Sequence, residues 1–144
     1  MNILVSACLL GMNCRYDGSH AYCPELERLM DEHMLIPVCP EHRGGLDTPR
    51  EPAERLGDKI IARDGTDVTE AFIRGAQETL RLAREYNCRY AIFKERSPSC
   101  GAGVIYDGHF NHTRVVGDGV TTQLLRANGV IVLGESQIGA LVHK

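Results

Sequence analysis

The sequence predicts an α/β fold: a single compact Rossmann-like domain over residues 1–144, with a mainly parallel sheet of about four strands, helices on both faces and small hairpins. Short apolar runs alternate along the chain with segments of helical periodicity, and this alternation favours a parallel sheet covered on both faces. The length suits one domain, and a content of 43% hydrophobic and 24% charged residues is ordinary for a globular protein.

Four apolar runs are predicted to be the buried strands of this sheet. They are rich in Ile, Val, Leu or aromatic residues, and turn-forming residues follow them. They cover residues 3–6, 35–38, 90–94 and 130–133.

Two longer helices are predicted between the strands. Residues 24–33 open with Pro24 and carry acidic residues in the first turn, both of which helix N-termini favour. Residues 69–86 present an apolar face at helical spacing, with Asp67 or Thr69 as the cap.

Two shorter helices are predicted near the C-terminus. Residues 120–127 form the first, which the Asn-Gly pair at 128–129 ends. Residues 136–142 form the second, with Ser136 as its cap.

Asp-Gly pairs indicate two small β elements outside the main sheet. Residues 59–66 are predicted to form a short strand and a turn at Asp64-Gly65. Residues 104–116 are predicted to form a hairpin, with a second Asp-Gly pair at 107–108.

Charge and hydropathy exclude several classes of protein. The net charge of −3 gives no general attraction to nucleic acid, and no run approaches the roughly 18–20 apolar residues of a membrane span. The apolar N-terminus lacks a basic region, so we expect no signal peptide and a cytoplasmic location. In a reducing compartment, the six cysteines are better explained by metal binding, catalysis or burial than by disulfides.

Three cysteines fall just after predicted strands: Cys8, Cys39 and Cys100. The carboxyl ends of parallel strands lie at one edge of a sheet, where such folds bind ligands, so these distant residues are expected to converge. Three thiolates form a soft site suited to zinc or iron–sulfur chemistry, and three ligands rather than four leave a coordination position open. The alternative is that these cysteines are small buried side chains, because no Cys-x-x-Cys pair is present.

Polar groups adjoin two of these cysteines. Glu41 lies two residues after Cys39, and the hydroxyls of Ser97 and Ser99 precede Cys100. A carboxylate beside a metal can orient water or move protons, and a hydroxyl can stabilise developing charge. Glu41 could instead serve only as an acidic residue at a helix start.

Ser99 is a candidate for substrate binding, and three further residues are candidates for the same role. Arg15 can clamp an anionic or carbonyl group, Tyr16 can stack on a ring, and Arg50 can contact a phosphate. The alternatives are an ordinary turn after Tyr16 and a solvated Arg50.

The remaining cysteines differ in their expected roles. Cys23 and Cys88 are interpreted as packing residues, since Cys88 precedes a strand and belongs at the opposite end of the sheet. Cys14 lies six residues from Cys8 and is the one competitor for a ligand role.

Five separated motifs resemble the thiouracil desulfidase family. They are SACLLG at 6–11, CRYDG at 14–18, VCPE at 38–41, FKE at 93–95 and SPSCG at 97–101. The GVTTQLL stretch at 119–125 is also similar to that family, so the resemblance covers nearly the whole chain.

The resemblance implies a [4Fe-4S] cluster held by three cysteines, which match Cys8, Cys39 and Cys100. The family's catalytic glutamate matches Glu41, and its catalytic serine matches Ser97. The implied reaction is non-redox removal of sulfur from a thiolated pyrimidine with release of sulfide. Thiouracil, a thiouridine nucleoside and a thiouridine nucleotide all stay open as substrates.

Other classes of function also stay open. The three thiolates could hold zinc, or the chain could be an iron–sulfur redox or nucleotide-binding module without desulfidase activity. A fourth ligand from Cys14 would favour electron transfer.

Overall fold

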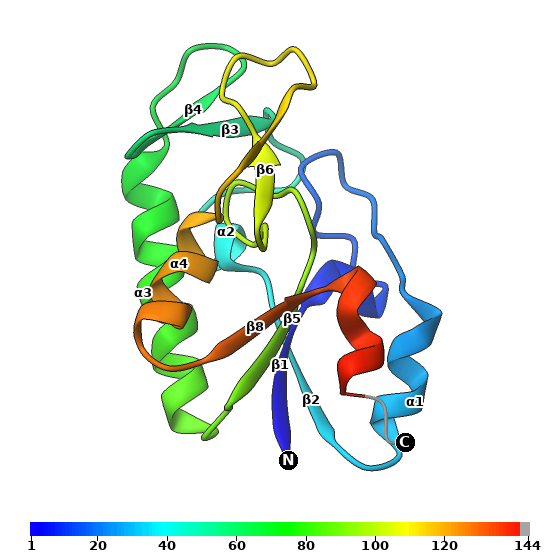
Figure 1. Cartoon of the computed structure of the whole chain (residues 1–144). Coiled ribbons are helices and arrows are strands. Elements are labelled where there is room, and N and C mark those ends of the chain that lie inside the picture. The colour runs from blue at the N-terminus through cyan, green and yellow to red at the C-terminus, as the bar shows by residue number, and fades with distance from the viewer. Residues whose placement is uncertain (142–144) are drawn as a thin grey trace.

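A computed structural model describes residues 1–141 (Figure 1). Its central sheet has four parallel strands in the order β2-β1-β5-β8. Their bounds are β1 Asn2–Ser6, β2 Met34–Val38, β5 Tyr90–Phe93 and β8 Ile131–Gly134. The predicted fold class and all four predicted strands are therefore confirmed, with ends shifted by one residue at most.

Helices cover both faces of this sheet, as predicted (Figure 1). One face packs against α3 (Thr69–Glu85) and α4 (Val120–Ala127). The other packs against the 3₁₀ helix η2 (Pro24–Leu26) with α1 (Glu27–Met30), and against the 3₁₀ helix η3 (Glu135–Ala140).

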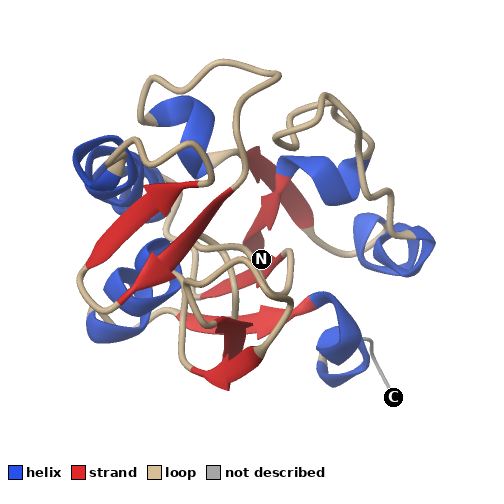
Figure 2. Ribbon diagram, turned by 90° about the horizontal axis from the view of Figure 1, so that it is seen from above, coloured by secondary structure: helices blue, strands red, loops and turns tan. Residues whose placement is uncertain are grey.

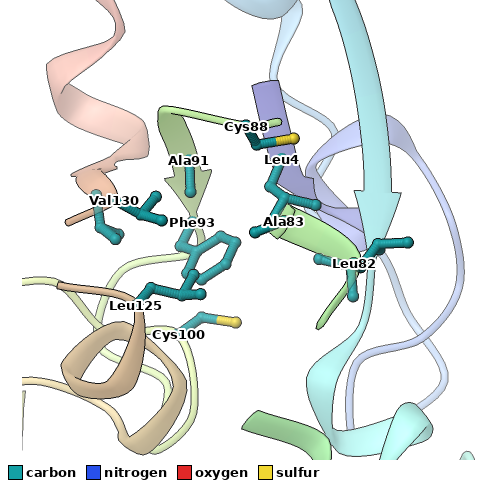
Figure 3. Packing of buried hydrophobic residues seen from close by; sticks show 11 residues of the cluster. Leu4, Leu82, Ala83, Cys88, Ala91, Phe93, Cys100, Leu125 and Val130 are labelled. Atoms are coloured by element: carbon teal, nitrogen blue, oxygen red, sulfur yellow. The ribbon is translucent and has the colours of Figure 1, made fainter. Parts of the chain in front are cut away.

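The core beneath α3 and α4 contains two of the cysteines. Figure 3 shows Cys88 and Cys100 at opposite ends of this cluster, with Phe93 between them. Their positions follow from β5, because Cys88 precedes the strand and Cys100 follows it. The predicted packing role of Cys88 agrees with its burial far from the carboxyl ends of the strands.

The connections create a topological switch point between β1 and β5. The connection from β1 to β2 crosses the sheet face that α1 covers. The connection from β5 to β8 runs in the opposite direction along the sheet and crosses the face that α4 covers. Such diverging connections open a crevice at the carboxyl ends of the two strands. The register brings Ser6 of β1 level with Val38 of β2, so the segments that follow these strands start side by side.

Two predicted helices differ from those observed. The helix expected over 24–33 ends at Met30. The chain then turns toward β2, and the His33 N–H donates a hydrogen bond to the Leu29 carbonyl at 2.9 Å. The last helix is a 3₁₀ helix that begins at Glu135, and the Ser136 hydroxyl donates to Glu95 instead of capping it. Its predicted end at Val142 lies outside the described residues.

Two hairpins lie above the carboxyl ends of the strands (Figures 1 and 2). One pairs β3 (Ala53–Leu56) with β4 (Lys59–Ala62), and the other pairs β6 (Val104–Tyr106) with β7 (Arg114–Val116). The turn predicted at Asp64-Gly65 is present, with Gly65 at φ 91°. None of the helices within residues 1–141 combines the length and the apolar character needed to cross a membrane.

Two short helices directly after strands were not among the predicted helices, although a helix start at Glu41 was the alternative interpretation of that residue. They are the 3₁₀ helix η1 (Ala7–Leu10), which follows β1, and α2 (Pro40–Arg43), which follows β2. A helix of four residues is too short to show a periodic pattern. Both matter to function, because η1 carries Cys8 and α2 begins directly after Cys39.

Candidate metal centre and active site

A cavity of about 420 Å³ opens at the switch point. Its walls come from the segments after β1, β2 and β5, and its outer part comes from the two hairpins. The three strand-end cysteines, Cys8, Cys39 and Cys100, all line it. The predicted convergence of these residues is therefore present in the structure.

Each of these cysteines is held by local structure. Cys8 lies in η1, where Gly11 takes a left-handed conformation (φ 92°) and ends the helix. Cys39 occupies the cap position of α2, followed by Pro40, whose fixed φ suits the first helical position. Cys100 closes a turn in which its backbone N–H donates to the Ser97 hydroxyl at 2.6 Å.

Cys14 joins the three strand-end cysteines in the cavity wall. The Cys39 thiol lowers the pKa of the Cys14 thiol, but the neighbouring Cys8 thiol and burial together raise it above its usual value. The Cys39 thiol also donates to the Cys14 carbonyl at 3.8 Å. The structure thus brings four sulfurs together, three from strand ends and one from the loop after η1.

Raised pKa values favour the protonated form of the Cys39 and Cys100 thiols in the metal-free protein. The interaction of its thiol with the Cys14 sulfur and, next, burial raise the pKa of Cys39 well above its usual value. Burial raises the pKa of Cys100 to about 12, although hydrogen bonds with Ser6 and Ser97 act in the opposite direction. Since metals bind thiolates, metal loading must release these protons.

The donor set fits an iron–sulfur cluster. The sulfurs border a hollow, as ligands of separate iron atoms in one bulky cluster must. Thiolates are also the preferred ligands of such clusters.

Glu41 lies in the first turn of α2 and lines the cavity. Its Oε2 accepts a hydrogen bond from Arg50 Nη2 at 2.5 Å in an ion pair whose side chains are 18% and 9% exposed. Arg50 does not line this cavity, and its guanidinium also contacts protein oxygens. The structure therefore places Arg50 behind Glu41, not at the surface that a substrate would meet.

The two serines before Cys100 have different surroundings. Ser97 lines the cavity, and its hydroxyl oxygen accepts from the backbone N–H groups of Ser99 (3.1 Å) and Cys100 (2.6 Å). These two bonds fix the oxygen and leave the hydroxyl hydrogen free to donate. Ser99 is only 1% exposed, and its hydroxyl lies 2.7 Å from Thr121 Oγ1 of α4, outside the cavity lining. The substrate contact predicted for Ser99 does not fit this position, which instead ties the Cys100 turn to α4.

Arg15 and Tyr16 both line the cavity, as expected for substrate contacts. Tyr16 is 41% exposed, so its ring is open to a ligand, and its carbonyl accepts from the Arg50 N–H at 2.7 Å. Their predicted roles in substrate binding stay predictions.

The hairpins form a roof over the cavity that the sequence did not reveal. Glu54 of β3 accepts hydrogen bonds from the backbone N–H groups of Gly108 (3.1 Å) and Phe110 (3.2 Å). The Arg63 guanidinium lies over the Phe110 ring, 5.7 Å from its centroid. Roof residues that line the cavity are Glu54, Arg63, Tyr106, Phe110, His112 and Arg114.

Strand ends offered a signal for other missed residues. Ser6 is the last residue of β1, and Lys94 follows β5, so both lie at carboxyl ends of strands, as the three cysteines do. The Ser6 hydroxyl accepts from the Lys94 N–H at 2.9 Å, and both residues line the cavity.

Comparisons with known proteins agree with this site. A family model described as 2-thiouracil desulfurase matches residues 3–137. The uncharacterized protein YbbK of Bacillus subtilis (strain 168) is 44% identical over 150 residues, which cover 97% of this chain and 99% of YbbK. A solved structure of the [4Fe-4S]-dependent thiouracil desulfidase TudS is 46% identical, with a TM-score of 0.92 and coverage of 97% of this chain and 94% of that chain.

Proposed function

The chain belongs to the 2-thiouracil desulfurase family, and we propose that Cys8, Cys39 and Cys100 hold the [4Fe-4S] cluster of its active site. The protein is a [4Fe-4S]-dependent thiouracil desulfidase. The observation that supports the ligand assignment is the meeting of three strand-end sulfurs on one cavity, beside a carboxylate.

The reaction is a non-redox exchange of sulfur for oxygen. The thiocarbonyl carbon of the pyrimidine gains the oxygen of a water molecule, and the sulfur leaves as hydrosulfide with a proton. When bound by three thiolates, the cluster supplies one iron without a protein ligand, which can act as a Lewis acid toward the thiocarbonyl sulfur.

Glu41 is the general base that takes a proton from the attacking water. Arg50 engages its Oε2, whereas Oε1 accepts no hydrogen bond from any residue within 1–141. The free oxygen of a carboxylate that lines the cavity is available to bind and deprotonate water.

Ser97, which also lines the cavity, relays or donates a proton. Its oxygen is fixed by two backbone N–H donors, so its hydrogen is directed to another acceptor. A pyrimidine ring nitrogen or oxygen that gains charge during the reaction is a suitable acceptor.

Arg15 and Tyr16 bind the pyrimidine in this scheme, and the roof encloses whatever is attached to it. Arg63 and Arg114 line the roof, so the cavity offers cations to a sugar or phosphate group as well as space for the base. The substrate thus contains a thiouracil base. The free base, its nucleoside and its nucleotide are the candidates for the fastest turnover. We also propose that the chain is a single domain, as predicted for residues 1–144, and that it works in the cytoplasm, where its six free thiols would stay reduced.

The test is sulfide release by anaerobically reconstituted protein. Thiouracil, thiouridine and thiouridine monophosphate are each incubated with the enzyme, and sulfide and the oxo product are quantified. We expect equal amounts of both products from the wild type. Glu41→Gln should keep its full iron content, while its turnover falls by about 100-fold or more to a rate that is still measurable. Glu70→Gln, whose side chain is exposed on α3, should turn over normally. Protein that binds zinc instead of iron, or iron-loaded protein that consumes none of the three compounds, contradicts the proposal.

A further inference from the structure

The Arg50 side chain is held beside the site by several hydrogen bonds. Its Nη2 donates to Glu41 Oε2 at 2.5 Å and to the Cys14 carbonyl at 3.0 Å. Its Nη1 donates to the Asp47 carbonyl at 3.1 Å and to Thr48 Oγ1 at 3.0 Å. With the side chain 9% exposed and both terminal nitrogens engaged, the guanidinium is fixed in one orientation.

This guanidinium reaches Glu41 from behind. Glu41 lines both the main cavity and a second cavity of about 170 Å³, whereas Arg50 lines only the second. The ion pair therefore lies in the wall between the two hollows. The arginine can hold the carboxylate without occupying the space in which substrate and water meet.

Helix α2 alone cannot fix the Glu41 side chain. The helix has four residues, and Glu41 is only its second. A glutamate there retains several rotamers unless another group selects one. The backbone N–H of Arg50 donates a hydrogen bond to the Tyr16 carbonyl at 2.7 Å. This bond ties Arg50 to the loop that contributes to substrate binding.

We infer that Arg50 is the positioning residue of Glu41: it selects the carboxylate orientation in which one oxygen faces the cavity, and it ties that orientation to the Cys14–Tyr16 loop. The inference rests on the proposed role of Glu41 as general base. Arg50 contacts neither substrate nor reacting atoms, so its loss should lower kcat and leave KM nearly unchanged. A misplacement of about 1 Å at a reacting group costs up to about 100-fold in rate, so we expect kcat to fall about 10- to 100-fold.

The experiment compares Arg50→Gln and Arg50→Lys with Arg43→Gln. Arg43 is the matched control, because it lies on α2, is exposed and does not line either cavity. For each reconstituted variant, iron content, the melting temperature, kcat and KM for thiouracil are measured. Arg50→Gln should show the loss in kcat with normal iron and KM. Arg50→Lys should recover part of it, since one ammonium can engage Glu41 but cannot reproduce the fork.

A double variant separates positioning from general stabilisation. If Arg50 acts through the Glu41 carboxylate, Glu41→Gln with Arg50→Gln should be no slower than Glu41→Gln alone, within about twofold. Losses that multiply would overturn the inference, as would an Arg50→Gln or Arg50→Lys enzyme with the wild-type kcat. If Arg50→Gln does not fold, Arg50→Lys decides by the same criteria.

Failure of the proposed function gives a different result. In that case the wild type and Arg43→Gln themselves release no sulfide. An active wild type with an unaffected Arg50→Gln refutes only the positioning role.

Discussion

Gly75→Ala should displace the active site from a distance, through the crossing of α2 and α3. The two helices meet at Gly44 and Gly75. A Cβ added to Gly75 would overlap the Pro40 carbonyl oxygen and lie 2.8 Å from the Pro40 carbonyl carbon and 3.3 Å from Gly44 N. Ordinary contact between carbons needs about 3.5–4.0 Å, so the helices must separate by about 1 Å.

Pro40 lies between Cys39 and Glu41, so this separation moves a cluster ligand and the base together. We expect turnover to fall about 10- to 100-fold, since reacting groups tolerate little misplacement. Overpacking against rigid backbone costs about 3 kcal/mol, and the better helix propensity of alanine offsets about 1 kcal/mol. The free energy of unfolding should then fall by about 2 kcal/mol, which lowers Tm by about 4–8 °C in a domain of this size.

Two assays test this prediction. Thermal unfolding of the metal-free protein gives Tm, and sulfide release by the reconstituted enzyme gives turnover. Gly139→Ala is the control, because a Cβ there meets nothing within 4 Å and both values should stay unchanged. A Gly75→Ala protein with wild-type Tm and turnover would refute the packing argument.

Three other perturbations probe the cysteines. Cys8→Ser should abolish the iron content and visible absorption of the reconstituted protein, whereas Cys88→Ser should keep both; equal effects of the two would contradict the ligand assignment. Cys14→Ala should retain a full complement of iron by metal analysis, since we assign only three ligands, and loss of the cluster would make Cys14 a fourth. The stability of the metal-free protein should fall as pH rises above about 9. In the unfolded chain the Cys100 thiol ionises near the ordinary cysteine pKa of 9.0, whereas in the folded protein burial raises its pKa to about 12. Urea unfolding between about pH 8 and pH 10 measures this loss, at most about 1.4 kcal/mol per pH unit for this thiol, and an equally steep loss in Cys100→Ala would exclude Cys100 as its source.

The sheet and the meeting of the cysteines could be predicted because both follow from local signals and one general rule. Apolar runs mark β1, β2, β5 and β8, and parallel strands present their carboxyl ends at a common edge. Cys8, Cys39 and Cys100 each follow a strand that is recognisable by itself.

The roles of Arg50 and Ser99 could not be predicted, because each depends on a distant partner. Arg50 is half-buried and bonded to the carbonyl of Cys14, 36 residues away, and a loop arginine gives no local sign of such a contact. Ser99 turns to Thr121 of α4, although its motif suggests a place beside Ser97 in the cavity.

The missed strand β3 is a different case, because a usable signal existed. The run Ala53–Leu56 has weak strand propensity, with Ala, Glu and Arg among its residues. However, Gly57-Asp58 before β4 is a two-residue hairpin signal, and Gly57 has the positive φ of 61° that such turns require. The Glu54 contacts that join the two hairpins depend on this pairing and could not be inferred without it.

The most direct test is Mössbauer spectroscopy of protein reconstituted with ⁵⁷Fe, before and after addition of thiouracil. Three cysteine ligands around a four-iron cluster leave one iron distinct, so thiouracil should change the signal of one iron in four, in the wild type and in Cys14→Ala alike. A spectrum that thiouracil leaves unchanged, or one that changes only when Cys14 is removed, would show that no iron is open to substrate.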